Sequence, residues 1–196
     1  MQFLFTRPAQ PFSSMSHDPD QVYQPEADTF LLLRAARAEV KSGDRVLEIG
    51  TGSGLISAEL ARVTGVVATD INPHAVMCAR GRGVEVVQSD LFSGIRGTFD
   101  LVIFNPPYLP TQPEERIDDW HEYALDGGES GRMVIERFAA EVGRVLAPEG
   151  RVLLLVSSLT GLGEVKDLFE SAKFSVDVVR QEPVEDEILY VLRIYT

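Results

Sequence analysis

The strongest constraint on the fold is a regular alternation of short apolar strand patterns with helical patterns. The strand patterns lie at residues 45–49, 66–70, 84–87, 99–104, 152–156, 174–180 and 189–194, and the helical ones at 28–40, 55–63, 73–80, 133–146 and 163–172. Continuously apolar strands that alternate with helices are typical of a parallel sheet covered by helices on both faces. The short acidic turn at 182–187 predicts that the last two strands form an antiparallel hairpin at one edge. We therefore predict an α/β, three-layer, Rossmann-like fold with a mostly parallel seven-stranded sheet. Asp28 is expected to cap the first helix.

Length and hydropathy predict one globular domain. The chain has 196 residues, of which 44% are hydrophobic, so it is long enough to bury a sizeable core. We expect this domain at residues 22–196, after a flexible arm at residues 1–21 that is rich in Pro, Ser and Asp. The sequence shows no apolar run of the length that a membrane span or a signal peptide needs, so we expect a cytoplasmic protein.

The cysteine and histidine content and the net charge argue against further classes of protein. A single cysteine cannot form a disulfide framework, and the three histidines lie far apart in the sequence, so no metal site is expected. The net charge of -12 repels polyanionic phosphate, which makes nucleic acid an unfavourable direct substrate.

A glycine-rich loop and two acidic residues predict a cofactor site. The loop Glu48-Ile-Gly-Thr-Gly-Ser-Gly54 lies between a strand and a helix, where its glycines allow close approach of a ligand. Asp70 ends the next strand and is placed to bind ribose hydroxyls, and Asp90 follows the third strand and is placed to accept the amino group of an adenine. These groups meet outside the carboxyl ends of the strands, where open α/β sheets bind ligands.

The chemistry of the loop favours a cationic cofactor. Leu55 stands where the dinucleotide fingerprint needs a third glycine, and the loop has no Lys or Arg to bind phosphate. Glu48 would repel a phosphate but can bind the ammonium group of an amino acid. S-adenosylmethionine, which carries a sulfonium and an amino-acid end, fits these residues best.

The tetrapeptide Asn105-Pro106-Pro107-Tyr108 follows the fourth strand at the same sheet edge. The side-chain carbonyl of Asn105 and the backbone carbonyl of Pro106 can accept both N–H bonds of an amide or amino nitrogen. That orients the nitrogen toward a methyl donor, and orientation supplies most of the catalysis. The prolines fix the direction of the carbonyls, and the ring of Tyr108 can stack on a planar amide or base.

These motifs, which span residues 48–108, resemble those of class I S-adenosylmethionine-dependent methyltransferases of the Asn/Asp-Pro-Pro-Tyr group. Two flanking segments narrow the resemblance. Residues 22–31 (Val-Tyr-Gln-Pro-Glu-Ala-Asp-Thr-Phe-Leu) resemble the entry segment of the small archaeal and eukaryotic branch of HemK/PrmC-type protein-glutamine methyltransferases. Residues 124–131 (Ala-Leu-Asp-Gly-Gly-Glu-Ser-Gly) resemble the substrate loop of that family. The resemblance covers about residues 22–196.

The resemblance implies an enzyme that methylates the glutamine amide in the Gly-Gly-Gln motif of peptide chain release factors. It assigns catalysis to Asn105, Pro106 and Tyr108. It places the cofactor on Tyr23, Pro25, Glu26, Thr29, Glu48, Gly50, Gly52, Gly54, Asp70, Asp90, Leu91 and Asn105. It places the substrate on Asn105, Pro106, Pro107, Tyr108, Gly127 and Gly128.

The small branch also resembles proteins that work with a small zinc-binding activator subunit, which pairs with the third strand. Val84, Val86 and Val87 lie on that strand, which is expected at a sheet edge where it could add a partner's strand. Arg80, Arg82 and Glu85 could instead guard this edge in a self-sufficient monomer.

The acidic loop residues Glu114, Glu115, Asp118, Asp119 and Glu122 suit a basic protein substrate. Two alternatives to the glutamine methyltransferase remain open. One is an amino methyltransferase acting on adenine N6 or guanine N2 of a nucleic acid, and the other is a non-catalytic subunit that only binds S-adenosylmethionine.

Overall fold

A computed structural model describes residues 18–112 and 119–196 of the chain. The predicted arm therefore lies mostly outside the described residues, as do Glu114, Glu115 and Asp118. The described end of the arm forms the 3-10 turn η2 (Pro19–Gln21), which lies against helix α3 (Pro73–Gly81). Across residues 18–112 and 119–196, no helix combines the length and the apolar character needed to cross a membrane.

Seven strands form one mixed sheet in the order β3-β2-β1-β4-β5-β7-β6, which confirms the predicted fold class. Neighbouring strands run parallel from β3 to β5, whereas β7 is antiparallel to both β5 and β6. The strands are β1 (Arg45–Ile49), β2 (Gly65–Asp70), β3 (Glu85–Gln88), β4 (Phe99–Phe104), β5 (Leu146–Ser157), β6 (Ser175–Val184) and β7 (Glu187–Tyr195).

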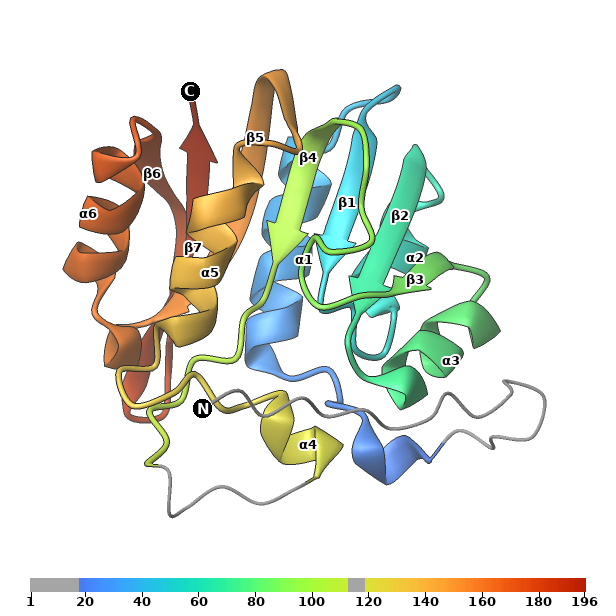
Figure 1. Cartoon of the computed structure of the whole chain (residues 1–196), viewed down its shortest axis with the longest axis horizontal. Helices are drawn as coiled ribbons and strands as arrows, with labels where there is room; N and C mark the ends of the chain where they lie inside the picture. Colours follow the sequence, from blue (N-terminus) through green and yellow to red (C-terminus); the bar gives the residue numbers. More distant parts are fainter. Residues whose placement is uncertain (1–17, 113–118) are drawn as a thin grey trace.

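Helices cover both faces of the sheet because successive strand residues point to opposite sides. On one face, Leu47 of β1 and Leu154 of β5 pack with α5 (Met133–Val142) and α6 (Leu162–Ser171). On the other face, Val46 and Leu153 pack with α1 (Ala27–Glu39) and α2 (Leu55–Leu60). Figure 1 shows α5 and α6 in front of the sheet and α1 behind it.

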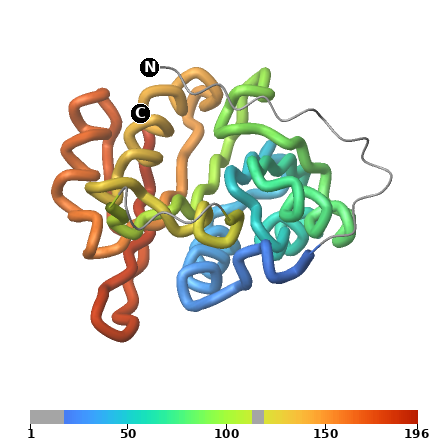
Figure 2. Tube along the Cα trace, turned by 60° about the horizontal axis from the view of Figure 1, so that its bottom comes forward, coloured from blue at the N-terminus to red at the C-terminus, as the bar shows by residue number. Residues whose placement is uncertain are grey.

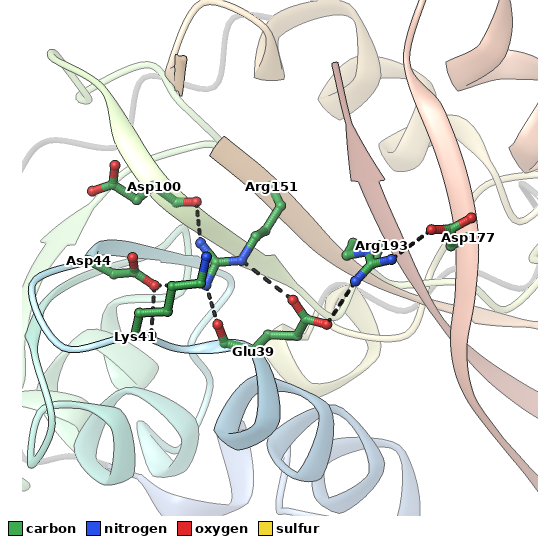
Figure 3. A network of polar contacts seen from close by, with 7 residues as sticks. All are labelled: Glu39, Lys41, Asp44, Asp100, Arg151, Asp177 and Arg193. Atoms are coloured by element: carbon green, nitrogen blue, oxygen red, sulfur yellow. Dashed lines mark hydrogen bonds and ion pairs between the residues drawn. The ribbon is translucent and has the colours of Figure 1, made fainter. Parts of the chain in front are cut away.

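A buried ion-pair network fastens α1 to the sheet at the end opposite the predicted site. Arg151 of β5 contacts the carboxylate of Asp44 (2.8 Å) and donates to the carbonyl of Asp100 (2.9 Å). Glu39, at the end of α1, lies between Arg151 and Arg193, as Figure 3 shows. The network stabilises the register of β4, β5 and β7 and leaves the other sheet edge for ligands.

The carboxyl ends of β1, β2 and β4 gather at one edge of the molecule, where the arrowheads point in Figure 1. Helix α4 (Trp120–Tyr123) and the segment before α1 lie at this same end, which faces forward in Figure 2. The two segments are joined by a hydrogen bond from the Trp120 backbone N–H to the Gln21 side chain (3.3 Å). The fold thus brings the predicted motifs and two covering segments together.

Some predicted boundaries were wrong. The helix expected at 133–146 ends at Val142, and β5 begins at Leu146 because its early residues pair with β4 through a register shift. The loop expected between 105 and 131 contains α4. Asp28 does not cap α1: the N-cap position is Glu26, and Asp28 lies buried inside the first turn.

Candidate active site

Glu48 organises the glycine loop from beneath. It is the second-last residue of β1 and is almost fully buried. Its Oε2 accepts hydrogen bonds from Thr51 Oγ1 (2.7 Å), the Ser57 backbone N–H (3.0 Å) and the Ser57 hydroxyl. Burial raises the pKa of Glu48 to about 7, although the hydrogen bonds from Ser57 and Thr51 oppose the shift. Glu48 therefore ties the loop to the start of α2 and borders the pocket as a group that can become negatively charged near neutral pH.

Asp70 holds the other side of the loop. Its Oδ2 accepts from the Gly52 N–H (2.8 Å) and its Oδ1 from the Asn72 N–H (2.8 Å). Burial raises the pKa of Asp70, and these backbone hydrogen bonds work against that rise. The loop needs glycine here because Gly50 and Gly52 have φ of 63° and 54°, in the left-handed region. Two buried carboxylates thus hold a tight backbone loop at the ends of β1 and β2.

Gly54 allows the start of α2 to pack closely against α3. It has a φ of 79°, and a Cβ at this position would lie 2.8 Å from the Ala79 Cα of α3. The residue lies outside the lining of the pocket, while Gly50 and Gly52 line it. Its observed contact lets α2 begin directly against α3.

Asp90 lies at the side of the pocket next to β3. Its carboxylate forms an ion pair with Arg137 of α5 at 2.7 Å, with both side chains nearly half exposed. Leu91 follows with φ of 46° and is buried. The charge of Arg137 is therefore balanced by Asp90, so it is not left free to bind a phosphate. This suits a ligand without phosphate.

Asn105 presents an unsatisfied acceptor. It follows β4, and its Nδ2 donates to Asp28 Oδ2 at 2.9 Å. Its Oδ1 is buried and has no hydrogen-bond partner within the described structure. A buried carbonyl oxygen without a donor is costly, and this oxygen is free to accept a hydrogen bond.

The ring of Tyr108 is held over the far side of the pocket. Its hydroxyl donates to Glu187 of β7 (3.5 Å), and Glu187 also accepts from the Ser157 hydroxyl. Burial and the charge of Glu187 raise the pKa of Tyr108, so the phenol stays protonated. Pro106 and Pro107 lie between Asn105 and this ring, and both line the pocket.

The two glycines of the predicted substrate loop lie beside the chain that leaves Tyr108. Gly127 N–H donates to the Leu109 carbonyl (2.9 Å), and the Gly128 carbonyl accepts from Thr111 N–H (3.1 Å). A Cβ on Gly127 would meet the Gly131 carbonyl oxygen at 2.7 Å, so the loop closes only with glycine there. Neither glycine lines the pocket itself.

The structure brings most of the predicted residues together around one pocket. These are Tyr23, Pro25, Thr29, Glu48, Gly50, Gly52, Asp70, Asp90, Leu91, Asn105, Pro106, Pro107 and Tyr108. Glu26, Gly54, Gly127 and Gly128 lie outside its lining, and their roles toward ligands stay predictions.

Sequence reasoning missed Asp28, Tyr123 and Arg137, which also line the pocket. A signal for Asp28 was present: it lies on α1 one turn before Leu31 and Leu32, which are buried. A carboxylate on the buried face of a helix indicates a polar partner in the interior. Arg137 could not be found in this way, because its contact with Asp90 comes from a distant segment.

Known proteins match this chain over most of its length. The family model "Methyltransferase small domain" matches residues 24–121. The Methanocaldococcus jannaschii protein MJ0928, named for protein N5-glutamine methyltransferase activity, is 40% identical over 88% of this chain and 90% of its own length. This chain belongs to the protein N5-glutamine methyltransferase family. A further relative within this family is human methyltransferase HEMK2, which is 36% identical over 88% of both chains.

A solved structure gives the same fold for the glutamine methyltransferases. It is that of Mtq2 from E. cuniculi in complex with Trm112, responsible for the methylation of the eRF1 translation termination factor. It superposes with a TM-score of 0.77 and 30% identity over 90% of this chain and 99% of that chain. Family and fold are those of S-adenosylmethionine-dependent methyltransferases, which implies use of this cofactor.

Proposed function

We propose that this protein methylates the side-chain amide nitrogen of the glutamine in the Gly-Gly-Gln motif of a peptide chain release factor. The single observation that carries the proposal is the buried Oδ1 of Asn105, which has no hydrogen-bond partner among the described residues. A primary amide supplies the N–H donor that this oxygen requires. The substrate named for Mtq2 supports a release factor as the protein that carries this amide.

The residues of the pocket suit S-adenosylmethionine as the donor. Its lining combines a glycine loop with the carboxylates of Glu48, Asp70 and Asp90, and its one described cation, Arg137, is paired. Such a set suits a sulfonium and an ammonium group and gives phosphate no binding partner. When bound, S-adenosylmethionine supplies an activated methyl group.

In this mechanism the chain acts mainly by orientation. Asn105 Oδ1 and the carbonyl of Pro106 accept the two N–H bonds of the glutamine amide. This orients the amide so that its nitrogen faces the methyl donor. The ring of Tyr108 stacks on the planar amide. S-adenosylmethionine held beside Asn105 by Glu48, Asp70 and Asp90 would supply the methyl group to this nitrogen, which would release one proton to solvent.

Intact-mass spectrometry of a release factor incubated with S-adenosylmethionine tests the proposal. We expect one added methyl group on the Gly-Gly-Gln glutamine, and loss of this product in Asn105→Ala. Asn105→Ala should retain its fold by circular dichroism. Methylation of oligonucleotides with none of the release factor would replace the proposal with a nucleic-acid methyltransferase. Cofactor binding without turnover on either substrate would instead indicate a non-catalytic subunit.

We also propose that a small zinc-binding activator subunit adds a strand to β3. Strand β3 is the edge strand next to β2, and Val87 on it is 37% exposed, while Val84 and Val86 are buried. Arg80 donates to the Val86 carbonyl (3.3 Å), so it touches the same strand. The assembly of Mtq2 with Trm112 supports a partner of this kind.

Co-expression with a Trm112-like subunit tests whether the subunit binds at strand β3. We expect Val87→Asp to lose co-elution with the subunit, because a charge on the exposed face of β3 opposes a packed strand. Val63→Asp is the matched control: Val63 is 52% exposed but lies outside the strand, so its variant should still co-elute. Equal co-elution of both variants, or full activity of the isolated chain that the subunit leaves unchanged, would contradict the proposal.

A further inference from the structure

The carboxylate of Asp28 lines the pocket and accepts a hydrogen bond from the nitrogen end of the Asn105 side-chain amide. Asp28 is 4% exposed in the first turn of α1. Its Oδ2 accepts from Asn105 Nδ2 (2.9 Å) and from the Tyr23 hydroxyl (3.0 Å), and its Oδ1 accepts from Thr29 N–H (2.5 Å). Each of these neighbours is a donor, so the carboxylate acts only as an acceptor.

This acceptor decides which end of the Asn105 amide faces the pocket. If the amide turned over, its Oδ1 would face the carboxylate and place two acceptors in contact, without a proton between them. The observed orientation instead gives Nδ2 to Asp28 and leaves Oδ1 as the buried atom without a partner. The hydrogen bond from Nδ2 to Asp28 therefore sets the orientation of the Asn105 amide.

The hydrogen bond also strengthens Oδ1 as an acceptor. When Nδ2 donates to a charged group, electron density shifts along the amide toward its oxygen. Hydrogen bonds that follow one another in a protein interior strengthen each other in this way. Tyr23 holds the carboxylate in place, because burial and the charge of Asp28 raise the pKa of Tyr23 and keep its hydroxyl a donor.

We infer that Asp28 is a positioning residue for methyl transfer, which fixes Asn105 Oδ1 toward the substrate amide. The inference rests on the proposed function, since it concerns the same Asn105. Tyr23 belongs to the same array, as the residue that orients Asp28. In this role Asp28 acts through Asn105, whose Oδ1 accepts from the substrate amide.

Kinetics of isosteric variants test the inference. In Asp28→Asn, the Thr29 N–H keeps the remaining oxygen at the Oδ1 position, so residue 28 turns its NH2 group toward Asn105 and the observed orientation is disfavoured. We expect kcat to fall about 10- to 100-fold, the factor for one hydrogen bond to a charged group. The Kd for S-adenosylmethionine and the melting temperature should change far less. Asp177→Asn, which removes the carboxylate on β6 that pairs with Arg193 of β7, is the control and should keep wild-type kcat.

A polarity swap gives a result that a merely structural role would not produce. Asn105→Asp alone sets two carboxylates against each other and should be nearly inactive. In the double variant Asp28→Asn with Asn105→Asp, residue 28 can donate and residue 105 still turns an oxygen to the substrate. We expect its kcat to exceed that of Asn105→Asp about 10-fold, whereas independent effects would make it slower than either single variant.

An NMR measurement tests the contact without any substrate. The side-chain NH2 signal of Asn105, assigned by its loss in Asn105→Ala, should shift in Asp28→Asn and stay unchanged in Asp177→Asn. An unchanged signal, or wild-type kcat in Asp28→Asn, would overturn the role of Asp28 while leaving the proposed function intact. Absence of release-factor methylation by the wild-type protein would instead overturn the proposed function, and with it the role of Oδ1 toward glutamine.

Discussion

Replacement of Glu48 by Gln should change how the stability of the protein depends on pH. Burial raises the pKa of Glu48 from 4.5 to about 7. Between these two values the folded protein keeps a proton that the unfolded chain has released. The free energy of unfolding therefore falls as pH rises across this interval. Gln cannot ionise, so Glu48→Gln removes this loss while its carbonyl can still accept from Thr51 and Ser57.

The size of the effect follows from the pKa. Each unit of difference between folded and unfolded pKa corresponds to about 1.4 kcal/mol, so a rise from 4.5 to about 7 costs the wild-type protein about 3 kcal/mol above pH 8. The cost is close to zero near pH 4. Asp70 titrates in the same direction because burial raises its pKa too, so a smaller slope should remain in Glu48→Gln.

Urea unfolding followed by far-UV circular dichroism at several values between pH 5 and pH 8.5 measures the effect. The unfolding free energy of Glu48→Gln, minus that of the wild type, should grow with pH toward about 3 kcal/mol. A difference that stays constant across this range would refute the reasoning, because it would show that Glu48 ionises in the folded protein as it does in the unfolded chain. Saturating S-adenosylmethionine should stabilise the wild type more than the variant at pH 8, since only the wild type supplies a carboxylate to a cation.

Two further predictions concern packing and the buried ion pairs. Gly54→Ala should destabilise the protein by about 2–4 kcal/mol, since its Cβ would meet the Ala79 backbone at 2.8 Å and its φ is 79°. Gly163→Ala is the control, because a Cβ at this position would meet open space, and it should change the melting temperature little. An equal loss of stability in the two variants would contradict the packing argument. Arg151→Met should cost about 3–5 kcal/mol in urea unfolding, because Asp44 and Glu39 stay behind with their buried partner removed. Arg34→Ala breaks an exposed pair with Glu182 and should cost under about 1 kcal/mol, so a similar loss in both variants would argue against the role of burial.

The centre of the sheet could be predicted from the sequence because β1, β4 and the later part of β5 are buried on both faces and read as continuous apolar runs. The edge hairpin could be predicted for a related reason, since a short turn can join only antiparallel strands. The early part of β5 could not, because Ala147-Pro148-Glu149-Gly150 has the composition of a turn. These residues belong to the strand only because Leu146 and Arg151 on either side of them pair with β4 across a register shift. Local propensity carries no information on such a pairing.

The pocket also has a part that could be predicted from the sequence and a part that could not. Glu48 and Asp70 lie at the ends of strands, and Asp90 and Asn105 follow strands. Parallel strands end at one edge of a sheet, so the meeting of these residues could be predicted from their order alone. Asp28 was interpreted as a cap because acidic residues favour helix starts. Its actual partner, Asn105, lies 77 positions away, and only the folded chain brings the two together.

The position of β7 has a consequence for how the chain folds. Strand β6 has β7 as its sole sheet partner, while β7 lies between β6 and β5, although it follows both in the sequence. The β6–β7 hairpin is local, whereas the pairing of β7 with β5 closes a long loop through α6. Loop-closure entropy therefore places hairpin formation first and its docking on β5 later. Until that docking, Glu187 cannot reach Tyr108, so the Tyr108 hydroxyl gains its hydrogen bond to Glu187 only after the hairpin has formed.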